Sequence, residues 1–238
     1  DNYEDINREL VRYGYFASTV PGTVAGLLEA HERYGKLSLN KVIAPVIRQA
    51  REGIIVSYDL HNAIKSAPQL YSDPESRRIY FSNEAPLAIH SLMKRPDLAD
   101  TLSLIAKNGK DGFYRGEIAQ KIAKAFSDNE GFISVDDLAS YKARIQLPIS
   151  TKYRGNTVFT QGPPSGTGIL MNNQMNNFAF KYGDASEISR SSSPGNKFEP
   201  GKRPMSTMNP VRVKNKDNGI ALITGSPGGS FIPAAALR

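Results

Sequence analysis

The spacing of hydrophobic residues changes once along this chain, close to residue 141. Before that point apolar residues recur three or four positions apart, as Val24, Leu27 and Leu28 do, which is typical of amphipathic helices. From residue 145 onward, short runs rich in β-branched residues alternate with turn residues and predict strands. Helices in one half and strands in the other indicate an α+β fold with a layered core.

Two of the expected helices carry local signals at defined residues. The helix that ends at Gly53 contains Pro45, which lacks a backbone N–H and should kink the helix or confine it to a short piece. Ser134, followed three residues later by Asp137, resembles a capping box. It should open a short helix over Val135–Tyr141.

The second half of the chain predicts strands joined by turns. Residues 145–150 and 156–160 are expected to form two strands around a turn at Arg154-Gly155. Basic and apolar residues alternate over 211–216, which predicts a strand with one solvent-facing side. Residues 219–224 predict a further apolar strand.

Composition excludes several classes of site. The 238 residues include no cysteine, which excludes disulfides, thiolate metal ligands and a cysteine nucleophile. The three histidines lack paired spacing, so a histidine metal site is not expected. No cofactor is expected. The net charge is +7, but basic residues are scattered among acidic ones, and no nucleic-acid partner is expected. No stretch approaches the ~20 apolar residues of a membrane span.

Two clusters near the end of the chain could bind an anion. Gly228 and Gly229 lie in a G-S-P-G-G-S run directly after the last predicted strand, and adjacent glycines allow two N–H groups to face one point. Such a nest stabilises an oxyanion. On the motif alone, a tight turn between strands is the favoured reading. Ser206 and Thr207 could donate to a carboxylate, or simply begin a strand.

A third cluster consists of amides. Five of the six residues from 172 to 177 are Asn or Gln, among them Gln174 and Asn177, and they follow an apolar run. Amides donate and accept hydrogen bonds, so the cluster suits recognition of a zwitterion. A hydrogen-bonded turn is the alternative.

Eight segments resemble, in order, motifs of the γ-glutamyltransferase family. The five that resemble the large subunit are Val20–Gly26, Arg51–Gly53, Asp136–Tyr141, Tyr153–Gly155 and Gly162–Ser165. The three that resemble the small subunit are Gly168–Met175, Pro200–Pro204 and Gly225–Gly229. The resemblance therefore divides the chain into a large-subunit-like part, residues 1–165, and a small-subunit-like part, residues 166–238.

The resemblance implies an N-terminal nucleophile hydrolase with a four-layer αββα sandwich, incompletely represented here. It implies a precursor that cuts itself into two subunits, whose new N-terminal threonine attacks γ-glutamyl amides such as glutathione. Water or an amino acid then accepts the γ-glutamyl group. By resemblance, Gly228 and Gly229 form the oxyanion hole. Ser206 and Thr207 bind the α-carboxylate, and Gln174 and Asn177 face the α-ammonium.

The chain departs from the family at two points. No residue matches the threonine of the processing site, because Ser165 is followed at once by small-subunit-like sequence. Residues 165 and 166 are therefore expected to be separated by a missing stretch; the alternative is a truncated, non-catalytic scaffold.

The second departure is Asn177, which stands where the family usually has aspartate. This leaves open a glutaryl-type (cephalosporin) acylase or a poly-γ-glutamate hydrolase of the same fold. A periplasmic or secreted location is expected, with a cytoplasmic one left open.

Overall fold

The computed structural model describes residues 13–160, 198–199, 201–202 and 210–224. The chain forms two compact units, which are described separately. The middle unit comprises Leu28–Ala119, and the sheet unit comprises Asp1–Leu27 with Gln120–Arg238. Helices α1 (Thr23–Tyr34) and α8 (Gly116–Asp128) each contribute residues to both units.

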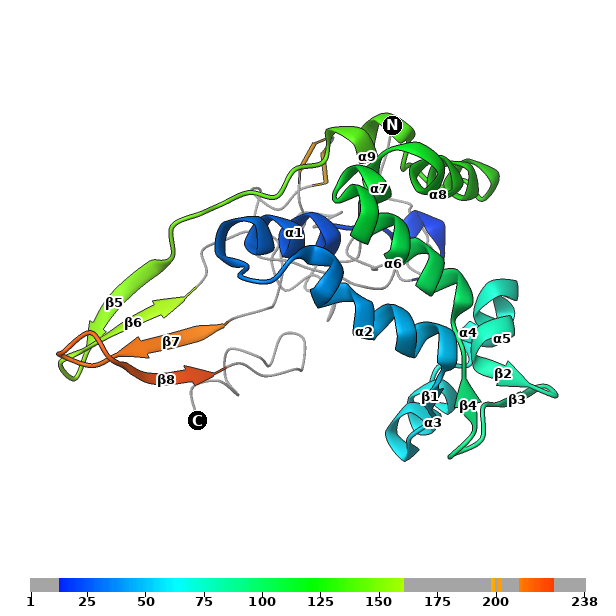
Figure 1. The fold of residues 1–238 in the computed structure, drawn as a ribbon, viewed down its shortest axis with the longest axis horizontal. Coiled ribbons are helices and arrows are strands. Elements are labelled where there is room, and N and C mark those ends of the chain that lie inside the picture. Colours follow the sequence, from blue (N-terminus) through cyan, green and yellow to red (C-terminus); the bar gives the residue numbers. More distant parts are fainter. Residues whose placement is uncertain (1–12, 161–197, 200, 203–209, 225–238) are drawn as a thin grey trace. The chain divides into compact units, whose positions relative to one another are not determined.

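The middle unit is mainly helical, and its two longest complete helices lie side by side (Figure 1). Its helices are α2 (Leu39–Glu52), α3 (Tyr58–Lys65), α4 (Gln69–Ser72), α5 (Pro74–Tyr80), α6 (Pro96–Asn108) and α7 (Asp111–Tyr114). Two short antiparallel pairs join them: β1 (Ile54–Ile55) with β4 (Leu92–Met93), and β2 (Phe81–Ser82) with β3 (Ala85–Pro86). The core side chains of this unit are Leu28, Val56, Ile64, Ala99, Ile105, Tyr114 and Ala119.

Helix α2 corrects one expectation about Pro45. The proline does not confine the helix to a short piece, because α2 is one helix of 14 residues that includes Pro45. Packing against α6 supplies the support that one missing hydrogen bond removes. An ion pair ties the end of α2 to α6, since Arg51 Nη2 lies 2.6 Å from Asp100 Oδ1. The expected stop at Gly53 is confirmed, with a φ of 108°.

The sheet unit contains a four-stranded antiparallel sheet in the order β5-β6-β7-β8. Its strands are β5 (Ile149–Tyr153), β6 (Asn156–Thr160), β7 (Val211–Lys214) and β8 (Ile220–Thr224). It also contains the 3-10 helix η2 (Tyr15–Ala17) and α9 (Val135–Ser140). Its core side chains are Ala17, Ala25, Phe126, Ile133, Leu138 and Val211.

Most of the expected strands are confirmed, and the boundaries of three of them differ by one to four residues from those expected. The turn at Arg154-Gly155 is a two-residue hairpin loop with φ of 47° and 79°, as the type I′ geometry requires. Strand β5 spans Ile149–Tyr153, so the expected strand over 145–150 starts four residues too early and ends three residues too early. Pro148 precedes the strand and has no N–H to give to a ladder.

Two of the family-like segments meet in the sheet unit. A Cβ added to Gly22 would overlap the hydroxyl oxygen of Tyr141 and lie 3.1 Å from the Cζ of its ring. The expected capping box is confirmed, because Ser134 Oγ accepts from the Asp137 N–H and Asp137 Oδ2 accepts from the Ser134 N–H. The box begins α9, whose Leu138 is fully buried.

None of the helices in the described ranges is both long enough and apolar enough to cross a membrane.

Replacing Gly22 by alanine should destabilise the sheet unit, because the new methyl group occupies the space of the Tyr141 hydroxyl. We expect a loss of about 1–3 kcal/mol in the free energy of unfolding, measured by urea denaturation. The additional substitution Tyr141→Phe removes the hydroxyl and should relieve part of the overlap with the new methyl group. The double variant should then lose at least ~1 kcal/mol less than the two single losses combined. Additive losses would show that the two residues do not meet.

Candidate functional site

The register of the sheet defines the first candidate site. Thr160 at the end of β6 pairs with Val211 at the start of β7, and Val211 pairs with Thr224 at the end of β8. The chain therefore leaves β6, enters β7 and leaves β8 at one end of the sheet (Figure 1). At this end Thr160 Oγ1 donates a hydrogen bond of 3.0 Å to the carbonyl oxygen of Pro210.

All the candidate site residues predicted from the sequence belong to segments that start or finish at this end of the sheet. They are Gln174, Asn177, Ser206, Thr207, Gly228 and Gly229, and they lie outside the described residues. Their assignment to substrate and oxyanion therefore stays a prediction. The described strands show that these segments are connected to β6, β7 and β8 at the same end of the sheet.

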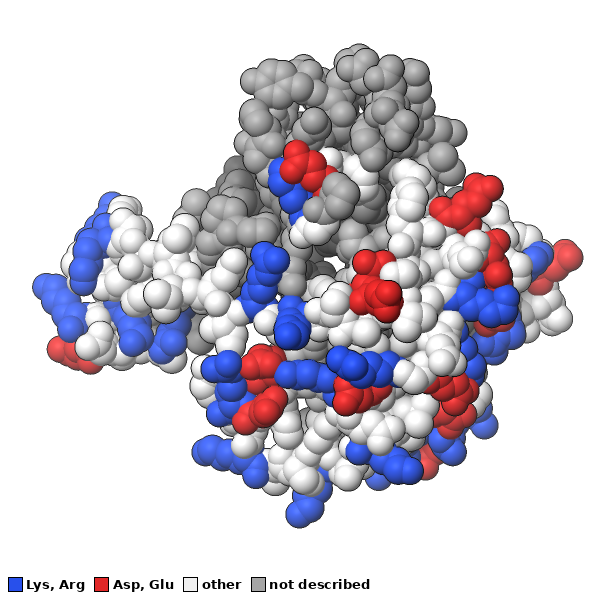
Figure 2. Space-filling model, turned by 90° about the horizontal axis from the view of Figure 1, so that it is seen from above, with Lys and Arg blue, Asp and Glu red and all other residues white. Residues whose placement is uncertain are grey.

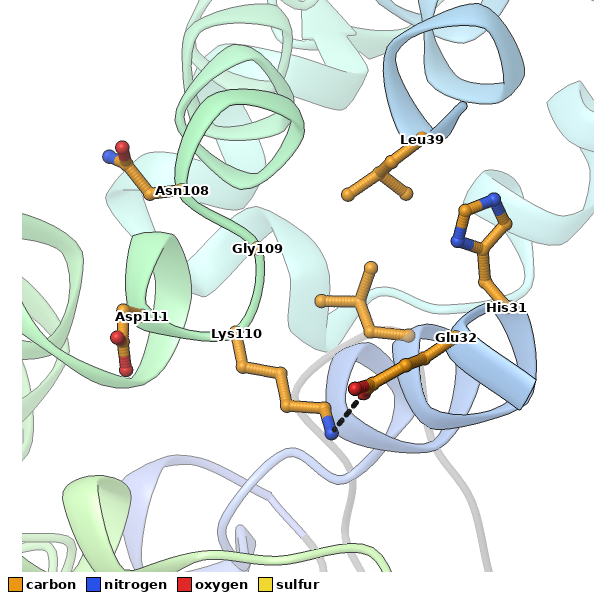
Figure 3. A pocket seen from close by; sticks show the side chains of 8 residues that line it. His31, Glu32, Leu39, Asn108, Gly109, Lys110 and Asp111 are labelled. Atoms are coloured by element: carbon orange, nitrogen blue, oxygen red, sulfur yellow. Dashed lines mark hydrogen bonds and ion pairs between the residues drawn. The ribbon is translucent and has the colours of Figure 1, made fainter. Parts of the chain in front are cut away.

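A second candidate is a pocket of about 430 Å³ within the middle unit. Leu28 on α1 and Leu39, the first residue of α2, supply apolar lining. Figure 3 shows Leu39 on one side of the pocket and Lys110 on the other. The remaining lining residues are mostly polar and come from α1 and from the junction of α6 with α7: His31, Glu32, Asn108, Gly109, Lys110 and Asp111. Its volume would suit a ligand of amino-acid size. Which ligand or chemistry it could support depends on the charges of its side chains.

The carboxylates and the ammonium that line this pocket are all in ion pairs: Lys110 pairs with Glu32 and with Glu29 beside the pocket, and Asp111 pairs with Arg115. Lys110 Nζ lies 2.6 Å from Glu29 Oε2 and 3.4 Å from Glu32 Oε2, and Glu29 also accepts from Arg33. The hydrogen bond from Lys110 lowers the pKa of Glu29, and the hydrogen bond to Glu29 raises the pKa of Lys110. Both groups thus stay charged at neutral pH. They cannot exchange protons there, which argues against general acid or base chemistry by this pair.

The imidazole of His31 is also engaged, since its Nε2 lies 2.9 Å from the carbonyl oxygen of Leu37. An N–H at Nε2 would donate to this carbonyl and fix the ring at the edge of the pocket.

The sequence could not reveal the charged cluster of Glu29, Glu32 and Lys110, because Lys110 and Glu29 are 81 positions apart. In the ranges that the structure describes, no group of three or more His, Cys, Asp and Glu side chains could hold a metal ion.

Comparison with solved structures confirms the expected fold class, the α+β fold of N-terminal nucleophile hydrolases. A cephalosporin acylase from Bacillus halodurans matches over 96% of this chain and 65% of its own, with a TM-score of 0.79; at 19% identity it shows the fold alone. A γ-glutamyltranspeptidase from Helicobacter pylori matches over 69% of this chain and 48% of its own, with a TM-score of 0.67 and 33% identity.

Comparison of sequences then defines the family. The sequence model of gamma-glutamyltranspeptidase matches residues 1–167 and 164–238. The glutathione hydrolase proenzyme of Escherichia coli (strain K12) is 39% identical over an alignment of 184 positions, and the match covers 73% of this chain and 32% of that protein. The chain therefore belongs to the gamma-glutamyltranspeptidase family, as the sequence motifs predicted. It spans about a third of the length of the curated relatives it matches.

The ion pair between Glu29 and Lys110 should make stability depend on pH. Because folding lowers the pKa of Glu29, its contribution is present above the ordinary carboxyl pKa of 4.5 and is lost as pH falls through the lower folded value. The difference in Tm between the natural chain and Glu29→Gln should therefore be clear near neutral pH and shrink in acid. Glu52→Gln, at an exposed carboxyl, is the control. Equal pH dependence in both variants would contradict the assignment.

Proposed function

We propose that this chain is part of an enzyme that transfers or hydrolyses the γ-glutamyl group of glutathione-like amides. The observation that carries the proposal is the register of β6, β7 and β8. Because of this register, the connection between β6 and β7 and the segment after β8, which contain the candidate site residues, join the sheet at the same end. Membership of the family supports the same activity. Because the chain spans about a third of its relatives, the nucleophile is proposed to lie in sequence outside these 238 residues.

The proposed reaction begins when the hydroxyl of an N-terminal threonine attacks the γ-carbonyl carbon of the substrate. The α-amino group of that threonine takes the hydroxyl proton and returns it to the leaving amine. The N–H groups of Gly228 and Gly229 donate to the oxyanion that forms between these events. Water or the amine of an amino acid then releases the γ-glutamyl group and restores the threonine.

Recognition of the glutamyl end requires donors for its carboxylate and acceptors for its ammonium. The hydroxyls of Ser206 and Thr207 are proposed to donate to the α-carboxylate. The amide oxygens of Gln174 and Asn177 are proposed to accept from the α-ammonium.

The short connections to the sheet support placing the Ser206–Thr207 cluster near the Gly228–Gly229 cluster. Thr207 lies four residues before Val211 and Gly228 four residues after Thr224. Since an extended chain spans at most ~3.6 Å per residue, each lies within about 14 Å of its strand end. Val211 and Thr224 are paired neighbours in the sheet. The carboxylate-binding and oxyanion-stabilising groups are thus tethered to adjacent positions.

The division into large-subunit-like and small-subunit-like parts at residues 165 and 166 belongs to the same proposal. It is supported by the two stretches of the family match, which overlap at residues 164–167. A long stretch that includes the processing site is proposed to separate the two parts in the protein. The resemblance also favours a periplasmic or secreted location.

The main alternative is an acylase that accepts a glutaryl group. Asn177 favours it, because a neutral amide cannot pair with the charge of an α-ammonium, which a glutaryl substrate lacks. A matched pair of anilide substrates, γ-glutamyl and glutaryl, distinguishes the two, since they differ only in the α-amino group. Faster turnover of the γ-glutamyl anilide by the full-length protein supports the main proposal.

The double variant Ser206→Ala/Thr207→Val should raise KM for the γ-glutamyl anilide by about 10- to 100-fold, because two donors to a charged carboxylate are lost. Release of the aniline, followed by absorbance, measures this effect. Ser192→Ala, in the same inter-strand connection, should leave KM unchanged. If the purified full-length protein releases no aniline, the proposed function fails; if both variants behave alike, only the carboxylate assignment fails.

Asn177→Asp should improve kcat/KM for the γ-glutamyl anilide by up to ~100-fold, since it adds a charge-assisted hydrogen bond to the α-ammonium. The gain should be much smaller for the glutaryl anilide. Asn176→Asp places the same charge one position away and serves as the control. Equal gains on both substrates, or an equal gain from Asn176→Asp, would rule out a role for Asn177 in reading the ammonium.

A further inference from the structure

The end of the sheet opposite to the candidate site is formed by two adjoining turns. One is the β5–β6 turn at Arg154-Gly155, and the other is the β7–β8 turn over residues 215–219. They touch, because a Cβ added to Gly155 would lie 3.0 Å from Lys216 Cε. We name the surface formed by these two turns and the strand ends beside them the hairpin tip.

The hairpin tip and its strands are strongly basic. Five basic residues and one acidic residue, Asp217, occur within 149–160 and 210–224. The basic residues are Lys152, Arg154, Arg212, Lys214 and Lys216. Figure 2 shows Lys and Arg gathered over these strands with little acidic surface among them.

Two of the lysines contact neutral neighbours. Lys152 Nζ donates to Thr157 Oγ1 at 2.7 Å, and Lys214 Nζ lies 5.9 Å from the centre of the Phe159 ring. In the part of the chain that the structure describes, none of the five forms an ion pair with a carboxylate. Their charge is therefore not neutralised locally.

Apolar side chains lie beside these charges. Tyr153, next to the β5–β6 turn, is 59% exposed, and Ile220, the first residue after the β7–β8 turn, is 56% exposed. The guanidinium carbon of Arg154 lies 5.3 Å from the centre of the Tyr153 ring. The tip thus combines uncompensated cations with exposed apolar groups.

We propose that the hairpin tip is a docking surface for an anionic lipid bilayer. Lysine and arginine near a bilayer attract acidic headgroups, and tyrosine and aliphatic side chains enter the boundary between headgroups and acyl chains. A nucleic acid fits less well. It offers no apolar layer to receive the exposed side chain of Ile220. Docking at this end leaves the opposite end of the sheet accessible.

The test is binding of the full-length protein to vesicles of phosphatidylcholine mixed with phosphatidylglycerol, compared with phosphatidylcholine alone. Each cation near an acidic bilayer strengthens binding by about fivefold. The variant Lys152→Gln/Arg154→Gln/Lys216→Gln should therefore bind the acidic vesicles on the order of 100-fold more weakly. Circular dichroism confirms that each variant is folded.

A matched control also removes two lysines and one arginine, but from the middle unit. The variant Lys36→Gln/Lys41→Gln/Arg48→Gln alters exposed side chains and lowers the net charge equally. It should keep most of the affinity, whereas equal losses in the two triple variants would show that only net charge matters and would overturn the proposal.

The apolar contribution has its own variant. Tyr153→Ser/Ile220→Ser should bind acidic vesicles in low salt but be released at lower salt than the natural chain, because only the screened electrostatic attraction remains. The proposal is overturned if the natural chain binds both vesicle types alike or neither. It is also overturned if an oligonucleotide displaces the vesicles while Tyr153→Ser/Ile220→Ser leaves vesicle binding unchanged.

Discussion

The antiparallel ladder of β6, β7 and β8 is the constraint on which both ends of the sheet unit depend. Pairing of Thr160 with Val211 and of Val211 with Thr224 sets which strand ends lie together. Because the strands are antiparallel, the same ladder sends the two hairpin turns to the far end. A slip of one residue would turn every side chain of a strand to the other face. The buried Val211 opposes such a slip.

Family-like motifs between residues 20 and 141 have structural roles in the described residues. Gly22 lies against Tyr141, and Ser134 with Asp137 begins α9. Arg51 ties α2 to α6 through Asp100. These motifs explain how the helices pack, whereas the segments proposed to carry chemistry follow in the second half. The family-like motifs are therefore of two kinds: the earlier ones position helices, and the later ones are proposed to recognise the substrate.

Local signals in the sequence predicted local structure well. The capping box, the Arg154-Gly155 turn and the last strand were each predicted from neighbouring residues, since their energetics are set within a few positions. The length of α2 beyond Pro45 could not be predicted, because packing against a distant helix decides it. The pairing of Glu29 with Lys110 is likewise a product of the tertiary fold. Motif order predicted the family, while the geometry of the candidate site residues stays a prediction.

Intact mass spectrometry of the protein purified after expression of its whole gene tests the central claim most directly. A self-processing member of the family should give two chains whose masses together far exceed 26.1 kDa, the smaller beginning with threonine. The missing stretch lies between residues 165 and 166 if peptide mapping assigns residues 1–165 to the larger chain and residues 166–238 to the smaller one. A single chain of 26.1 kDa, with a fragment that reads continuously through residues 165 and 166, would contradict it. The chain would then lack a nucleophile and could not catalyse γ-glutamyl transfer by the proposed route.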